Sequence, residues 1–236
     1  TPDCIVITPS IRYQQYSYSP NILKVHNHLE YHRELSNKKS LFKNLKSYYS
    51  KKGVNPFEYI PITYHVTGQT DPQFAEFQLN FPMSKVWLVK PGENTNRGTG
   101  IDVVDSVESA GESIRKHAGK HRTFILQQYI IPFLYERRKF DIRCYVLVTS
   151  INHTIKGYWY DEGYIRTSSK LFTLDNLSTR LVHLTNDAVQ KKSEDYGKYE
   201  PANKLSFHDF EKYLGEHHPQ LSFWRSVYPK LIVTLH

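Results

Sequence analysis

Two segments, VWLVKPGENTNRGTGI at residues 86–101 and RKFDIRCYVLV at residues 138–148, decide how we interpret the fold of this chain. Each joins an apolar strand to a cluster of charge or glycine. In the first segment Lys90 ends the strand, and a loop with three glycines and an arginine follows before a second strand begins at Ile101. Glycines let backbone N–H groups approach phosphate oxygens closely, and Lys and Arg neutralise the phosphate charge. The segment therefore predicts a phosphate-binding flap between paired strands, with an ordinary polar hairpin as the alternative.

The second segment places charged side chains within an apolar strand. Lys139, Asp141 and Arg143 alternate along it, so all three project from one face. Charges on one face of a mainly buried strand are costly unless they pair or bind a ligand. They could form a network among themselves, but we favour a site where the cations meet phosphate or carboxylate and Asp141 orients a metal or an amine. Residues 140–149 form a near-continuous apolar run, which predicts a strand buried on both faces.

The composition is that of a globular protein with a basic balance. The 236 residues are 39% hydrophobic and 23% charged, which is enough to bury a core. No apolar run approaches the length of a membrane span, and the first residues lack the pattern of a signal peptide. The formal charge of +8 predicts attraction to polyanions, but the basic residues are scattered, which argues against nucleic acid. Two cysteines cannot build a disulfide framework, so we expect a reducing, cytosolic compartment.

Hydrophobic periodicity predicts an α/β or α+β fold with a substantial mixed sheet and flanking helices. Leu41, Leu45 and Tyr48 share one face of a helix expected at residues 38–49. Further helices are predicted at 107–118, 206–214 and 219–235, and strands at 59–64, 86–90, 101–104 and 123–130. The sequence DEG at 161–163 predicts the turn of a hairpin between strands at 154–160 and 163–167.

Three further segments carry weaker signals. The sequence QQYI at 127–130 ends a strand, and a strand edge with backbone groups beside apolar side chains can read an adenine ring. Arg166 could hold a carboxylate through its guanidinium fork, while Thr185 and Asn186 offer a hydroxyl and an amide to a ribose or phosphate. His183, just before them, is expected to be structural. The sequence contains no Gly-x-Ser-x-Gly elbow and no His-Glu-x-x-His or paired Cys-x-x-Cys zinc motif.

In this order and with similar spacing, the segments resemble the tubulin–tyrosine ligase-like family of ATP-grasp ligases over roughly residues 27–215. The resemblance rests on WLVKP (87–91), RGTGI (97–101), QQYI (127–130), RKFDIR (138–143), EGYIR (162–166) and HLTNDAVQK (183–191), with ELSNK (34–38) upstream. It implies an ATP-grasp-like fold in which two sheet-bearing lobes clamp ATP. The implied division is an N-terminal basic region at 1–84, a central lobe at 85–130 and an incomplete C-terminal lobe at 131–236.

The resemblance also implies roles for individual residues. Arg143 and Arg166 would be the catalytic pair, facing the γ-phosphate and the carboxylate of an amino acid. The residues implied in nucleotide binding are Lys38, Lys90, Arg97, Gly98, Thr99, Gly100, Ile101, Gln127, Gln128, Tyr129, Ile130, Lys139, Asp141, Thr185 and Asn186. Mg²⁺ would accompany ATP, but the family's late Asp and Glu-x-Asn ligands have no counterpart after Asn186. We therefore expect a fragment whose metal ligands lie beyond His236 and which has little ligase activity alone.

The family's chemistry activates a carboxylate as an acyl phosphate, which an amine then attacks to form an amide. The resemblance thus implies an ATP-dependent ligase that adds glycine, glutamate or tyrosine to the acidic tails of tubulin, and the motifs do not agree on one amino acid. The alternative is a catalytically inactive module of the same fold that binds nucleotide and microtubules. A nucleic-acid binder ranks below both. We expect a monomer without nucleic-acid or membrane partners, located in the cytoplasm on microtubules, including those of cilia or flagella.

Overall fold

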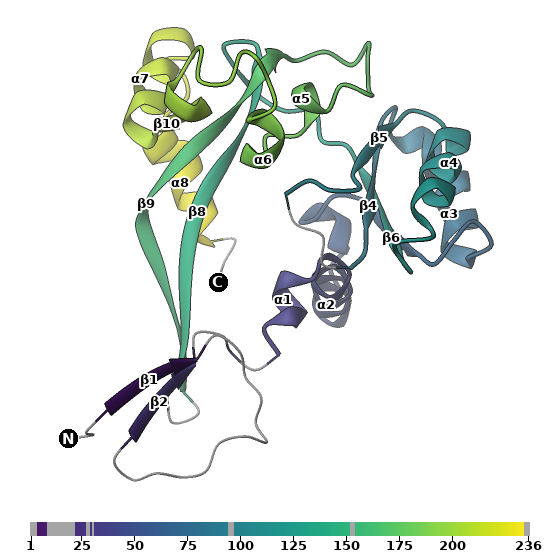
Figure 1. Ribbon diagram of the computed structural model, residues 1–236, viewed down its shortest axis with the longest axis horizontal. Coiled ribbons are helices and arrows are strands. Elements are labelled where there is room, and N and C mark those ends of the chain that lie inside the picture. Colours follow the sequence, from purple (N-terminus) through teal and green to yellow (C-terminus); the bar gives the residue numbers. More distant parts are fainter. Residues whose placement is uncertain are drawn as a thin grey trace.

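The computed structural model describes residues 4–8, 22–26, 29, 31–93, 97–151 and 154–233, with the backbone alone at 4–8, 22–26 and 233. Strands β1 (Cys4–Thr8) and β2 (Ile22–His26) pair in parallel. The other described strands form two four-stranded sheets with flanking helices (Figure 1). The predicted α+β class and ATP-grasp-like architecture are confirmed.

The first sheet has the strand order β3-β6-β4-β5, with every pair antiparallel. Its strands are β3 (Thr63–Val66), β4 (Trp87–Pro91), β5 (Asp102–Val104) and β6 (Phe124–Gln128). The sequence placed the last three to within two residues, but β3 begins later than the predicted strand at 59–64. Two prolines explain the delay, because Pro56 opens a short 3₁₀ helix, η2 (Pro56–Glu58), and Pro61 has no N–H for a sheet ladder.

One face of the first sheet carries the core of this half of the molecule. Helices α3 (Pro72–Asn80) and α4 (Val107–His117) cover that face, and a short 3₁₀ helix, η3 (Phe81–Met83), follows α3 (Figure 1). Trp87, Val89 and Leu126 are fully buried beneath them with Phe77. The predicted helix at 107–118 is confirmed, and its Ser106 forms a capping box with Ser109.

The opposite face of the first sheet receives α2 (Lys38–Lys51), which follows the short α1 (Arg33–Ser36) (Figure 1). Asn37 caps α2 by accepting hydrogen bonds from the N–H groups of the first turn. The predicted helix is confirmed, and its buried residue is Phe42, while Leu41 and Tyr48 are exposed. The spacing of the apolar residues located the helix but not its rotation against the sheet.

The second sheet has the order β10-β9-β8-β7, again antiparallel throughout. Its strands are β7 (Leu134–Tyr135), β8 (Arg138–Ile151), β9 (Thr154–Leu171) and β10 (Lys204–Ser206). The predicted hairpin turn at 161–163 was wrong, because these residues lie within β9. Pairing shifts there from Arg143 with Tyr164 to Tyr145 with Tyr160, so the segment forms a β-bulge. Residues 152 and 153, between β8 and β9, lie outside the described residues.

Helices lie on both sides of the inner part of this hairpin (Figure 1). On one side α7 (Phe207–His217), a π-helix η5 (Phe223–Val227) and α8 (Tyr228–Val233) form a core with Ile165 and Leu205. On the other side are α5 (Arg180–His183) and α6 (Asp187–Gln190), and a 3₁₀ turn η4 (Pro201–Asn203) leads into β10. The helix predicted at 219–235 begins only at Phe223, after Ser222 caps it. Within the described ranges, none of the helices has the length and apolar character needed to cross a bilayer.

The predicted burial of residues 140–149 on both faces was wrong. Phe140 and Ile142 pack against the core, but Tyr145 to Val148 are exposed, and Leu147 is 61% exposed. Figure 1 shows the reason, since the hairpin extends well beyond α7. We call the β3–β6 sheet with α1–α4 the first lobe, and the β7–β10 sheet with α5–α8 the second lobe.

Candidate functional site

The first lobe brings two lysines together in a cavity between α2 and its sheet. Lys90 lies on the face of β4 that is turned toward α2, and its Nζ donates to Gln127 Oε1 at 2.6 Å. Gln127 is held in turn, because its Nε2 donates to Thr63 Oγ1 at 2.9 Å. Lys38, the first residue of α2, lines the same cavity of about 210 Å³ as Lys90 and Gln127. A neutral amide orients the ammonium group of Lys90 but does not neutralise its charge.

The pKa values of these lysines are lowered from the ordinary value of a lysine. Burial lowers the pKa of Lys90 to about 8, and the charges of Lys38 and Lys139 act in the same direction. Burial likewise lowers the pKa of Lys139 to about 8, although Asp141 partly offsets it, and burial lowers the pKa of Lys38. Desolvation and the repulsion of Lys90 by Lys38 and Lys139 both disfavour the charged form, and an anionic ligand would offset both effects.

The second lobe supplies Lys139, which meets the first lobe at Tyr129. Lys139 Nζ donates to the Tyr129 hydroxyl at 3.1 Å and lies 4.5 Å from the centre of its ring. The Tyr129 hydroxyl lies 3.1 Å from His183 Nδ1, and His183 Nε2 lies 3.4 Å from the Asn176 carbonyl. The ring must donate to that carbonyl, so Nδ1 accepts from Tyr129. Burial lowers the pKa of His183 and raises that of Tyr129. His183 is therefore a neutral, structural histidine, as the sequence predicted.

Asp141 is the centre of a polar network on the second lobe. It pairs with Arg166, whose Nε and terminal nitrogen both lie 2.9 Å from Oδ1. Thr185 donates its hydroxyl to Oδ2 of the same carboxylate. The cation that balances Asp141 is therefore Arg166 of the neighbouring strand β9, because Asp141 and Arg166 are register partners. These contacts bring together Asp141, Arg166 and Thr185 of the predicted site. Lys139 and Arg143 instead contact Tyr129 and Tyr145.

A second cavity, of about 580 Å³, lies beside this network and is rich in cations. It is lined by Arg97, Arg143, Tyr164, Arg166, Asn186, Asp187, Ala188 and Lys191. Asp187 pairs with Lys191 at 2.9 Å, so the lining keeps an excess of positive charge. Arginine forks of this kind bind phosphate or carboxylate oxygens in pairs. Lys191 and Tyr164 were given no role from the sequence, although both stand within the motifs that carried the resemblance.

The glycine loop forms the flap that the sequence predicted, with residues 94–96 outside the described residues. Arg97, Gly98 and Gly100 have positive φ angles of 63°, 76° and 71°. A Cβ atom on Gly98 would lie 3.0 Å from Asn186 Oδ1 of the second lobe, so a side chain there would be strained by its positive φ and would crowd Asn186. Thr99 and Arg97 are exposed at the tip of the flap. The flap thus bridges the lobes, and this closure could not be inferred from the loop's composition.

The segment 127–130 does not present the open strand edge that we expected. β6 is an interior strand of its sheet, between β3 and β4. Gln128 N–H donates to the Ile62 carbonyl at 2.8 Å, and Tyr129 N–H donates to the Val86 carbonyl at 3.0 Å. These two N–H groups are therefore occupied, and only Ile130, which is 56% exposed, leaves the sheet toward solvent.

The described residues include no cluster of three or more His, Cys, Asp or Glu side chains that could hold a metal ion. A two-lobed α+β fold with half-buried lysines, a cluster of arginines and a glycine flap defines a protein of the ATP-grasp type.

Comparison with known proteins agrees with that class. Residues 16–234 match the model of the tubulin-tyrosine ligase family, so the chain belongs to this family. Tubulin glycylase 3B of Tetrahymena thermophila is 33% identical over 62% of this chain. A probable tubulin polyglutamylase of Caenorhabditis elegans, ttll-9, is 30% identical over 69% of the chain, and the human probable tubulin polyglutamylase TTLL2 is 28% identical over 94% of it. The chain covers only 12%, 40% and 36% of these proteins' own lengths.

Proposed function

We propose that this chain is the nucleotide-binding part of an ATP-dependent ligase that joins an amino acid to tubulin. The observation that carries the proposal is the group formed by Lys38 and Lys90 of the first lobe and Lys139 of the second, in which burial lowers each pKa and the charges of Lys38 and Lys139 act on Lys90. A group of desolvated cations in a family of ligases fits the polyphosphate of ATP.

Different residues of the chain would bind different parts of the substrates. The lysine group would neutralise phosphates, and the flap at 97–101 would cover them, while Thr185 and Asn186 lie beside Asp141 and Gly98. The chain around Ile130 would take the adenine. When bound, ATP would convert a carboxylate into an acyl phosphate, which an amine then attacks. Arg143 and Arg166 would orient the reacting carboxylate and the transferred phosphoryl group, because charge neutralisation and positioning supply most of the catalysis in such transfers.

The relatives indicate the substrates. Those named above are a tubulin glycylase and probable tubulin polyglutamylases, so we propose glycine or glutamate as the added amino acid and tubulin as the acceptor. A location on microtubules is part of the same proposal. The chain's formal charge of +8 suits an acidic polypeptide acceptor. Because the described residues hold no metal cluster, Mg²⁺ would be bound by ATP and by groups outside them.

The test offers tubulin, ATP and labelled glycine, glutamate or tyrosine to the full-length protein. Lys90→Ala and Asp141→Ala should abolish incorporation, whereas Lys85→Ala, an exposed lysine just before β4, should leave it intact. Incorporation at the wild-type rate in either site variant would refute the proposed roles. A wild-type protein that binds ATP and microtubules but incorporates no amino acid would instead establish the inactive module.

A further inference from the structure

The flap is fastened to the second lobe by a residue that no motif singled out. Arg180, the first residue of α5, donates through one terminal nitrogen to the Gly98 carbonyl at 2.6 Å and through the other to the Ile101 carbonyl at 3.3 Å. The two acceptors stand at the two ends of the glycine turn, and the Ile101 N–H also donates to the Gly98 carbonyl at 3.4 Å. A single guanidinium therefore spans the turn.

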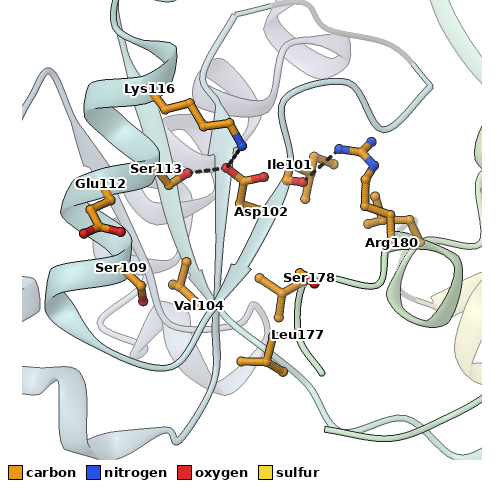
Figure 2. Close-up of a pocket in the computed structure, with 12 residues that line it drawn as sticks. Ile101, Asp102, Val104, Ser109, Glu112, Ser113, Lys116, Leu177, Ser178 and Arg180 are labelled. Atoms are coloured by element: carbon orange, nitrogen blue, oxygen red, sulfur yellow. Dashed lines mark hydrogen bonds and ion pairs between the residues drawn. The ribbon is translucent and has the colours of Figure 1, made fainter. Parts of the chain in front are cut away.

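The contacts of Arg180 with the flap lie at the edge of a cavity. This cavity, of about 560 Å³, is lined by Asp102, Ser113 and Lys116 of the first lobe and by Leu177 and Ser178 of the second. Figure 2 shows Arg180 reaching Ile101 across the cavity, while Ser113 and Lys116 turn to Asp102 on the far side. Ser113 and Lys116 are thus engaged within their own lobe, at 2.7 and 3.8 Å from Asp102. The cavity leaves one side of the flap open, while Gly98 lies against Asn186 on another side, so on the open side the hydrogen bonds of Arg180 hold the flap.

Because Arg180 fixes the orientation of the Gly98 carbonyl, it also fixes the orientation of the N–H group in the same peptide. In a trans peptide the C=O and the following N–H point in opposite directions. With the Gly98 carbonyl turned toward Arg180, the Thr99 N–H must point away from α5. Backbone N–H groups with a defined direction are what a glycine flap uses to bind phosphate oxygens. A flap that rotates freely about its glycines would have to be ordered by the ligand, at an entropic cost.

We propose that Arg180 is a positioning residue that latches the flap at 97–101 in its nucleotide-binding orientation, which deepens and rests on the proposed function. Arg180 touches neither reacting group in this arrangement and acts through the backbone of Gly98 and Ile101. Lysine has one ammonium group and cannot donate to both carbonyls with the same fork geometry, so it should replace arginine only in part.

The test compares Arg180→Ala, Arg180→Lys and the control Arg225→Ala, an exposed arginine of the π-helix, in the full-length protein. We expect Arg180→Ala to raise the hydrogen exchange of flap amides in the absence of nucleotide. It should also weaken binding of a non-hydrolysable ATP analogue by about tenfold, with an unchanged melting temperature. Arg180→Lys should fall between Arg180→Ala and the wild type, and Arg225→Ala should match the wild type.

Two results would overturn the latch. Flap exchange and analogue affinity that both stay at wild-type values in Arg180→Ala would show that the contact does not position the flap. A loss of affinity accompanied by a lower melting temperature and faster exchange throughout the second lobe would show a merely structural role. If the wild-type protein binds no ATP analogue, the proposed function fails, and the nucleotide role of Arg180 fails with it, whereas exchange in the flap still reports whether the latch exists.

Discussion

The inner and outer halves of the β8–β9 hairpin belong to the same two strands but have opposite environments. In the inner half Arg138 is 2% exposed, although it carries a full charge. In the outer half Leu147 and Ile155 are 61% and 71% exposed, although both are strongly apolar. The inner half lies between α7 on one side and α5 and α6 on the other (Figure 1). Burial along this hairpin therefore follows what packs on the strands and not the hydrophobicity of the strands themselves.

The comparison also explains why the inner half can hold a site. Two of its arginines are compensated by carboxylates, with Arg138 bonded to Glu200 and Arg166 bonded to Asp141. Low exposure strengthens such contacts and makes an uncompensated charge expensive. Lys139 of the inner half donates instead to the neutral hydroxyl of Tyr129, and Lys90 of the first lobe donates to the neutral amide of Gln127. The outer half has neither the enclosure nor the network.

The largest expected effect tests the buried pair of the inner half. Glu200→Ala should destabilise the protein by about 3–5 kcal/mol, because it leaves the Arg138 guanidinium buried without its carboxylate. It also removes the acceptor of the Thr167 hydroxyl at 2.7 Å. The urea midpoint of unfolding and hydrogen exchange in β9 measure the change. Glu194→Ala is the matched control, since that exposed carboxylate should cost less than about 1 kcal/mol. Equal losses in the two variants would contradict the contrast between a buried and an exposed ion pair.

The next prediction concerns the titration of the inner cations. With pKa values of about 8, Lys90 and Lys139 are charged at pH 7 and neutral at pH 9 in the ligand-free protein. Affinity for an ATP analogue should therefore fall about tenfold between pH 7 and pH 9 for each lysine that must be protonated to bind. Stability of the ligand-free protein should change in the opposite sense, because the unfolded lysines bind more protons in this window and stability then rises with pH. Lys139→Ala should flatten the pH dependence of affinity, and an unchanged slope would contradict its role.

A pair of glycines compares the two halves directly. A Cβ atom at Gly163, in the bulge beside the inner half, would lie 2.2 Å from the Arg143 carbonyl oxygen and 2.5 Å from the Phe207 ring. Gly163→Ala should thus cost about 1–3 kcal/mol. At Gly157, in the outer half, a Cβ atom would meet nothing within 4 Å, so Gly157→Ala should be neutral or slightly stabilising. The melting temperatures of the two variants measure this difference. A larger loss of stability in Gly157→Ala than in Gly163→Ala would contradict the contrast between the two halves.

The smallest expected effect lies in the exposed apolar residues. Leu147→Ser and Ile155→Ser should each change the free energy of unfolding by less than about 0.5 kcal/mol, since both side chains remain largely in water. Thermal unfolding of the full-length protein provides the measurement. A loss of several kcal/mol in either variant would show that the outer half is covered in the whole protein.

Much of the fold could be predicted because periodicity reports local structure. The helix at 107–118 and the strands at 86–90 and 101–104 agree with α4, β4 and β5 to within one residue at each end. Turn chemistry was less reliable, because DEG at 161–163 forms a bulge inside β9 and not a turn. Glycine and acidic residues suit both a turn and a bulge, so the pairing of β9 with β8 determines which of the two forms. Helix α3 was missed, since its aromatic residues carried no pattern that we recognised.

Part of the candidate site could likewise be predicted from the sequence, and part could not. Alternation alone put Lys139, Asp141 and Arg143 on one face, and the packing of the partly buried Phe140 and Ile142 against the core agrees with it. Alternation could not show that Asp141 pairs with Arg166, because that contact depends on the register of β8 with β9. The role of Arg180 was likewise absent from the sequence, since its acceptors are backbone carbonyls some eighty residues away.

The sequence by itself determined the family, the α+β class, the glycine flap and the set of charged residues, because motifs, strand alternation and glycine positions are local properties of the chain. Only the tertiary structure decided which charges are compensated, which lysines are desolvated, where the hairpin is covered and what fastens the flap. These depend on distances and burial between segments far apart in the sequence, and the free energy of a charge is set by those surroundings.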